Sequence, residues 1–150
     1  MTSFPNDYEG AWTLAKTVFR KGIGLHSGEE AQVRLLPSDK AGFYVSWRDS
    51  DEAPVMLCAD KAFDSQLCTT LKVGNRSLST VEHLLAALAG CGLTHVHLEV
   101  SGEEIPLLDG SAIGWVDAIL EAGFAPANTP RLVAPVVKKA MAFNRGKSVI

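Results

Sequence analysis

A glutamate and a histidine stand side by side at the start of the clearest helical pattern in this chain. Glu82 and His83 lie within residues 79–90, where apolar residues recur at i, i+3, i+4 and i+7 counted from Val81. At about 100° per residue, His83 lies roughly opposite this apolar stripe and Glu82 lies to its side. An imidazole can bind zinc while a neighbouring carboxylate takes a proton from an attacking water. The pair is therefore a candidate for metal-assisted hydrolysis.

A plainer interpretation of the pair stays open. Ser79, followed by Glu82 three residues later, fits a capping box at the start of the helix. A solvent-facing histidine is common, and catalytic zinc usually needs three protein ligands. Spacing alone therefore does not decide between a catalytic pair and a capped helix.

Three further places could carry chemistry, and each has an ordinary structural explanation. His95 and His97 point the same way from a strand, but we expect them, with Glu99, to form an exposed polar face. His26 lies in the glycine-rich residues 22–28, which could approach a ligand closely or make a tight turn. Their glycines do not follow the GxGxxG pattern, so no dinucleotide fold is indicated. Asp109 precedes a helix, where a capping role is expected.

The elements that position these residues indicate an α+β fold. Alternating apolar and polar residues predict half-buried strands, and Gly74-Asn75 predicts a tight hairpin. Gly22 and Gly24 are expected to end the first strand. Strands followed by helices and a later strand predict two layers, with the helices packed on one face of a mainly antiparallel sheet. Strands are predicted at residues 13–19, 31–35, 43–47, 66–73, 76–78 and 95–100, and helices at residues 79–90 and 111–122.

Composition narrows the class of protein. The 150 residues are 47% hydrophobic and 21% charged, with a formal net charge of −3, so a nucleic-acid partner is not expected. Cys58, Cys68 and Cys91 have no CxxC spacing and indicate reduced thiols. No apolar run approaches the ~20 residues that span a bilayer, and the amino terminus lacks the pattern of a signal peptide. We expect a cytoplasmic protein without stable membrane insertion.

The composition changes near residue 124 and predicts three parts. Residues 1–10 are expected to be a flexible amino terminus, residues 11–125 one domain, and residues 126–150 a linker and the start of a second domain. Within the last part, residues 136–143 look strand-like, residues 144–146 turn, and a return strand begins at residue 147. A hairpin that stops in its second strand leaves unpaired edge groups, so we expect a truncated chain.

Four stretches resemble one enzyme family, the UDP-3-O-acyl-N-acetylglucosamine deacetylases of Gram-negative lipid A synthesis. The resemblance covers roughly residues 14–123, and the combination of STVEH with EIPLLDGSA is the specific part of it. The four stretches are residues 22–28 (GIGLHSG), 67–69 (LCT), 79–90 (STVEHLLAALAG) and 104–112 (EIPLLDGSA).

The resemblance implies roles for particular residues. His83 would be a zinc ligand and Glu82 the general base for a water that attacks the acetamide carbonyl, so that acetate leaves the glucosamine nitrogen. The substrate would be a UDP-linked acylated glucosamine. Leu67, Cys68 and Thr69 would lie near the metal and the entrance to an acyl groove. His26 would lie near the substrate, whereas His95 and His97 would not bind the metal.

The resemblance also implies a missing half. In the family a second domain of the same polypeptide supplies a His and an Asp one helical turn apart as further zinc ligands, and another His acts on the leaving group. No His-x-x-x-Asp occurs in this sequence, whose last histidine is His97. We therefore expect this chain alone to lack tight zinc binding and deacetylase activity. A stand-alone, non-catalytic binding module with the same fold is the alternative.

Overall fold

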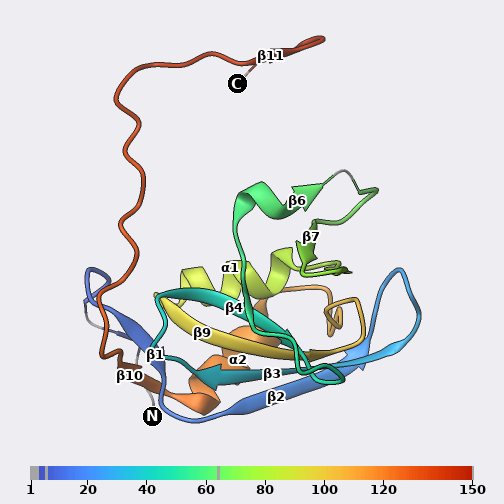
Figure 1. Cartoon of the computed structure of the whole chain (residues 1–150), viewed down its shortest axis with the longest axis vertical. Helices are drawn as coiled ribbons and strands as arrows, with labels where there is room; N and C mark the ends of the chain where they lie inside the picture. The colour runs from blue at the N-terminus through green and yellow to red at the C-terminus, as the bar shows by residue number, and fades with distance from the viewer. Residues whose placement is uncertain (1–3, 6, 64, 150) are drawn as a thin grey trace.

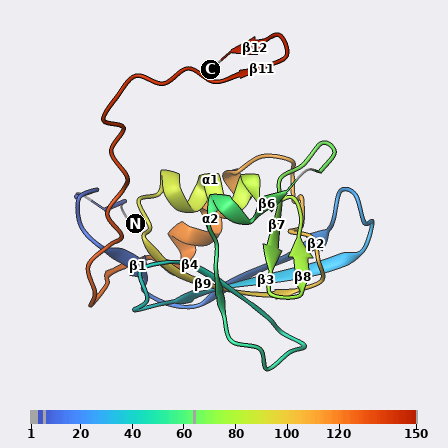
Figure 2. The same ribbon diagram turned by 45° about the horizontal axis from the view of Figure 1, so that its top comes forward.

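The largest sheet has five strands, and both helices lie on one of its faces. The computed structural model describes residues 4–5, 7–63 and 65–149. The sheet has the order β2-β3-β9-β4-β5, and neighbouring strands are antiparallel except for the parallel pair β4 and β9. Figures 1 and 2 show α1 and α2 on the same side of this sheet, which confirms the predicted α+β architecture. The elements are β1 (Trp12–Leu14), β2 (Val18–Ile23), β3 (Glu30–Pro37), β4 (Gly42–Trp47), β5 (Val55–Met56), η1 (Ala59–Lys61), β6 (Ala62–Phe63), β7 (Thr70–Val73), β8 (Arg76–Leu78), α1 (Glu82–Gly90), β9 (His95–Ser101), α2 (Ile113–Ala122), β10 (Phe124–Pro126), β11 (Asn144–Arg145) and β12 (Ser148–Val149).

The core lies between the sheet and the helices, as the period-2 patterns predict. Successive strand residues point to opposite faces, so the apolar set of each strand is buried together. The helices contribute the other half of the same cluster, with Trp115 and Ile119 of α2 fully buried. The strand residues of the cluster include Val33, Leu35, Val45, Trp47, Val96, Leu98 and Val100, and α1 adds Leu84, Ala87 and Leu88.

The first predicted strand is wrong in its bounds. Residues 13–19 were expected to form one strand that ends at the glycines, but the chain forms β1 and then β2, which continues to Ile23. The reason is the register with β3, in which Gly22 pairs with Ala31 and Ile23 pairs with Glu30. The turn falls later, where the Gly24 N–H donates to the carbonyl of Glu29.

The predicted exposure of His95 is also wrong. His95 is 0% exposed. Its Nδ1 lies 2.7 Å from the Thr94 hydroxyl and its Nε2 lies 3.0 Å from the Thr129 hydroxyl. The strand pattern did not reveal this burial, because Thr129 belongs to the segment that follows β10 and covers the ring from outside the sheet.

A small three-stranded sheet leads into α1. β6, β7 and β8 pair antiparallel, and Gly74, with φ +63°, makes the predicted hairpin turn between β7 and β8. Both predicted helices are present, but α1 begins at Glu82, three residues later than expected, and α2 begins at Ile113, two residues later.

The segment after β10 differs from the prediction. Residues 136–143 were expected to be strand-like, but they form no strand and are exposed; the hairpin of β11 and β12 begins only at Asn144. Arg131 is bonded to Glu9 at 2.8 Å and to the carbonyl of Tyr8. The division at residues 10 and 125 stays a prediction, and residues 1–3, 6 and 150 of the expected terminal parts lie outside the described residues. Among the helices that the structure describes, none is both long enough and apolar enough to cross a bilayer.

Candidate active site

Glu82 and His83 open α1 and lie partly exposed, away from the residues that this helix buries. Val81 is the residue that precedes the helix, and its side chain is buried. Glu82 is therefore the first residue of the helix rather than the third. The predicted capping box is wrong, because the Ser79 hydroxyl contacts Thr70 at 3.1 Å and makes no cap.

The Glu82 carboxylate is instead held by the backbone of Thr69, the residue that precedes β7 (Thr70–Val73). The Thr69 N–H donates to Glu82 Oε2 at 3.0 Å, and the Thr69 carbonyl accepts from Val81 N–H. Residues 67–69 are thus fixed beside the start of α1. A carboxylate that accepts a single backbone hydrogen bond keeps lone pairs free to accept a proton.

Backbone strain is concentrated around this point. Among the described residues, the non-glycine residues with positive φ are Leu67 at 60°, Thr80 at 57° and Leu108 at 57°. Leu67 precedes Cys68, Thr80 lies two residues before Glu82, and Leu108 precedes Asp109. Such conformations cost of order 1–3 kcal/mol each and gather at functional sites. The Leu67 side chain is also 93% exposed.

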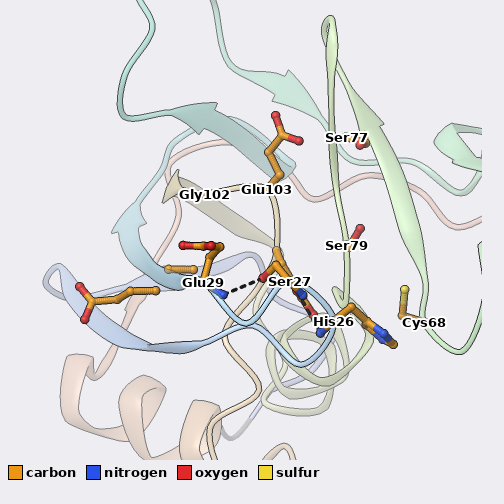
Figure 3. A pocket seen from close by; sticks show the side chains of 11 residues that line it. His26, Ser27, Glu29, Cys68, Ser77, Ser79, Gly102 and Glu103 are labelled. Atoms are coloured by element: carbon orange, nitrogen blue, oxygen red, sulfur yellow. Dashed lines mark hydrogen bonds between the residues drawn. The ribbon is translucent and has the colours of Figure 1, made fainter.

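A pocket of about 520 Å³ opens beside these residues and is lined by His26 and Cys68. Figure 3 shows the His26 side chain extending toward Cys68, while Ser79 lies above them on the strand that leads to α1. Among the described residues, no hydrogen bond is made by the ring nitrogens of His26 or His83. Both imidazoles are therefore available to a ligand.

Glu104 forms the floor of this pocket and is 5% exposed. Its carboxylate accepts from the N–H groups of His26 and Ser27, at 3.0 and 2.8 Å, and from the Thr80 hydroxyl at 2.8 Å. Burial raises the pKa of Glu104, but these hydrogen bonds outweigh it and lower the pKa to about 2. The group is therefore an anion at neutral pH.

Asp109 lies in the turn before α2 and within electrostatic reach of His83. Hydrogen bonds from the N–H and hydroxyl of Ser111 lower the pKa of Asp109, and the charge of His83 acts in the same direction. Asp109 is not the cap of α2, because the residue before the helix is Ala112 and it has no side-chain cap.

The donor atoms around His83 are of the kinds that a metal such as zinc accepts. His83 offers an imidazole nitrogen, with carboxylates of Glu82 and Asp109 nearby, which is suitable donor chemistry. Yet no group of three or more His, Cys, Asp or Glu residues that could hold a metal is found in the described ranges.

The structure shows two pairs among the residues proposed from the sequence. Thr69 contacts Glu82 directly, and Cys68 shares a pocket with His26. Sequence reasoning assigned no role to Glu104 or Thr80. Glu104 opens the motif of residues 104–112, which its exposed neighbour Glu103 precedes, but hydrophobic periodicity does not reveal its burial, and a positive φ at a threonine has no sequence signal.

Known proteins with similar sequences indicate the class of protein to which this chain belongs. A family model described as "LpxC: UDP-3-O-acyl N-acetylglycosamine deacetylase" matches residues 11–150. A UDP-3-O-acyl-N-acetylglucosamine deacetylase of Trichormus variabilis is 46% identical over 114 residues, which cover 74% of this chain and 40% of the relative. Proteins of the same name from Geotalea uraniireducens and Thermosynechococcus vestitus are each 37% identical, over 89% and 92% of this chain and 44% and 49% of the relatives.

The match covers nearly the whole chain, and the resemblance found in the sequence is thereby confirmed. The chain belongs to the UDP-3-O-acyl-N-acetylglucosamine deacetylase family. It spans less than half the length of these three relatives.

Proposed function

We propose that this chain provides the Glu82–His83 part of the active site of a zinc-dependent deacetylase. The substrate is UDP-3-O-acyl-N-acetylglucosamine, the reaction removes its N-acetyl group as acetate, and the step belongs to lipid A synthesis in the cytoplasm. The observation that carries the proposal is the position of Glu82. Its carboxylate lies beside His83 at the start of α1 and is fixed by the Thr69 N–H at 3.0 Å.

The chemistry assigned to these residues is the hydrolysis of an amide. Zinc, when bound with His83 as one ligand, polarises a carbonyl and lowers the pKa of a water. Glu82 accepts the proton of the water whose oxygen bonds to the acetamide carbon. The bond from that carbon to the glucosamine nitrogen then breaks, the nitrogen receives a proton, and acetate is released.

The neighbouring residues have supporting roles in this proposal. His26 lies near the sugar, and Leu67, Cys68 and Thr69 border the acyl chain and the metal. The exposed, strained Leu67 supports this, since an apolar side chain held in solvent is suited to contact with an acyl chain. The remaining zinc ligands and the donor to the leaving nitrogen come from a second domain of the same polypeptide.

A chimera tests the proposal. The matched segment of the Trichormus variabilis relative is replaced by the corresponding residues of this chain, and acetate release from the UDP-linked substrate is measured. We expect turnover with one zinc per molecule, and loss of turnover with zinc retained in the Glu82→Ala chimera. An inactive chimera beside an active parent would contradict the proposal and favour the non-catalytic binding module.

The chain alone is expected to behave differently from the chimera. One histidine ligand does not hold zinc tightly, so we expect neither turnover nor a stoichiometric zinc complex after dialysis. A stoichiometric complex of the isolated chain, measured by elemental analysis, would overturn the expectation that the other ligands come from a second domain.

A further inference from the structure

A buried carboxylate joins two segments of the candidate site that are far apart in the sequence. Glu104 accepts hydrogen bonds from the backbone of His26 and Ser27 and from the Thr80 side chain. The bond to His26 spans 78 residues and the bond to Thr80 spans 24 residues. No other carboxylate among the described residues has hydrogen bonds to both the histidine loop and the segment before α1.

On one side, Glu104 fills a cradle of backbone N–H groups. Residues 24–28 turn tightly, with the Gly28 N–H donating to the Gly24 carbonyl at 3.0 Å. Successive N–H groups of such a turn form an anion-binding nest, and here the anion is the Glu104 carboxylate. A Cβ at Gly24 would overlap this carboxylate and the Ser27 hydroxyl, so only glycine lets the loop close on it.

On the other side, Glu104 holds the strained residue that precedes α1. Thr80 is 2% exposed and has φ +57°, an unfavourable conformation for a β-branched residue. Its neighbour Ser79 is bonded to the same segment, with Ser79 N–H donating to Glu103 and Ile105 N–H donating to Ser79. This backbone conformation directs the chain into the first turn of α1, where Glu82 and His83 lie.

We infer that Glu104 is a positioning residue whose carboxylate occupies the nest of residues 24–28 and sets the place of His26 relative to Glu82 and His83. The effect on turnover rests on the proposed function, whereas the effect on the loop does not. A second consequence concerns the substrate. Because Glu104 already accepts from the N–H groups of His26 and Ser27, these two N–H groups do not bind the diphosphate of the substrate.

The first experiment uses the chain as it is and compares Glu104→Gln with Glu99→Gln. Glu99 is the matched control. Its carboxylate lies 2.7 Å from the Arg34 guanidinium, on the face of the sheet that points away from the helices. We expect the amides of His26 and Ser27 to exchange with solvent at least about 10-fold faster in Glu104→Gln, and unchanged in Glu99→Gln. Unchanged exchange in both variants would overturn the inference.

Inorganic phosphate tests the nest directly. In the unaltered chain, phosphate should leave the amide resonances of His26 and Ser27 in place, because the nest is filled. Shifts of these resonances that saturate with phosphate in the unaltered chain would show a free nest and would overturn the inference.

If Glu104→Gln fails to fold, a second pair of variants tests the same link from the other side. Thr80→Val removes only the hydroxyl that donates to Glu104, whereas Thr80→Ser keeps it. We expect Thr80→Val to speed the exchange of the backbone amides of residue 80 and His26 with solvent. Thr80→Ser should leave these exchange rates as they are in the unaltered chain. Equal behaviour of the two variants would contradict the proposed link.

The effect on turnover is measured in the active chimera. A misplacement of about 1 Å can cost about 100-fold in rate, so we expect Thr80→Val to lower kcat about 10- to 100-fold with zinc content unchanged. Thr80→Ser should restore most of it, which a general loss of stability would not explain. An inactive unaltered chimera would refute the proposed function alone, since the exchange experiments on the isolated chain still decide the role of Glu104.

Discussion

Histidines and glutamates occur in two regions of this molecule, the edge of the domain at the start of α1 and the strand β9 of the large sheet, and their surroundings differ. On the sheet, both ring nitrogens of His95 lie near threonine hydroxyls, and His97 Nε2 lies 2.7 Å from the Ser46 hydroxyl. At the start of α1, the rings of His26 and His83 make no hydrogen bond among the described residues. The sheet histidines are already paired, whereas the edge histidines are fixed through their backbone and open to a ligand.

The sheet histidines are also desolvated, and backbone strain lies in the other region. Burial lowers the pKa of both His95 and His97, so each ring is neutral at pH 7. The positive φ values of Leu67, Thr80 and Leu108 all lie in loops at the edge of the domain. Residue type alone is therefore a poor guide to function, and free ring nitrogens beside strained backbone are a better one.

The strongest test of the comparison is removal of the carboxylate at the start of α1. Glu82→Ala in the chimera should lower kcat about 100- to 10,000-fold, the range that general acid–base catalysis contributes, with zinc retained. Acetate release and elemental analysis measure both quantities. Near-normal turnover would refute Glu82 as the base.

The histidines give the next largest contrast. His83→Ala in the chimera should lower zinc occupancy and turnover together, because a ligand is lost. His95→Ala should leave zinc content unchanged and instead lower the free energy of unfolding by about 1–3 kcal/mol, since a fully buried ring and its hydrogen bonds are lost. Loss of zinc in His95→Ala would remove the distinction between the two regions.

Acid should destabilise the chain through Glu104. The pKa of Glu104 is about 2 in the folded protein against an ordinary value of 4.5, so its contribution is present above pH 4.5 and is lost as the pH falls toward 2. The shift corresponds to about 3 kcal/mol. Denaturant unfolding at pH 6 and pH 3 should show a smaller loss in Glu104→Gln than in the unaltered chain or Glu99→Gln. Equal losses in all three would contradict the low pKa.

The smallest effect on stability is expected at Leu67. Because its side chain is 93% exposed, Leu67→Ala should change the free energy of unfolding by less than about 0.5 kcal/mol. In the chimera it should raise KM for the acylated substrate, which loses an apolar contact. Leu71→Ala, at a buried residue of β7, is the contrasting variant and should cost about 2–5 kcal/mol. An unchanged KM in Leu67→Ala would remove Leu67 from the acyl groove.

The sequence by itself determined the layers, the helices and the family. Period-2 and period-3.6 patterns record which side of each element is buried, and that information is local to the element. The motifs of residues 79–90 and 104–112 identified the family, because they are runs of neighbouring residues. Glu82 and His83 were found in the same way.

Only the tertiary structure decided which polar groups are satisfied. The partners of Glu104 are 78 and 24 residues away, and Thr129, which lies beside the ring of His95, is 34 residues away. Such pairings depend on how loops cross the edge of the sheet, which no periodicity encodes. The same cause explains why the predicted capping box is wrong. The positive φ of Thr80 places Glu82 in the first position of α1. There its carboxylate contacts Thr69, 13 residues earlier in the sequence.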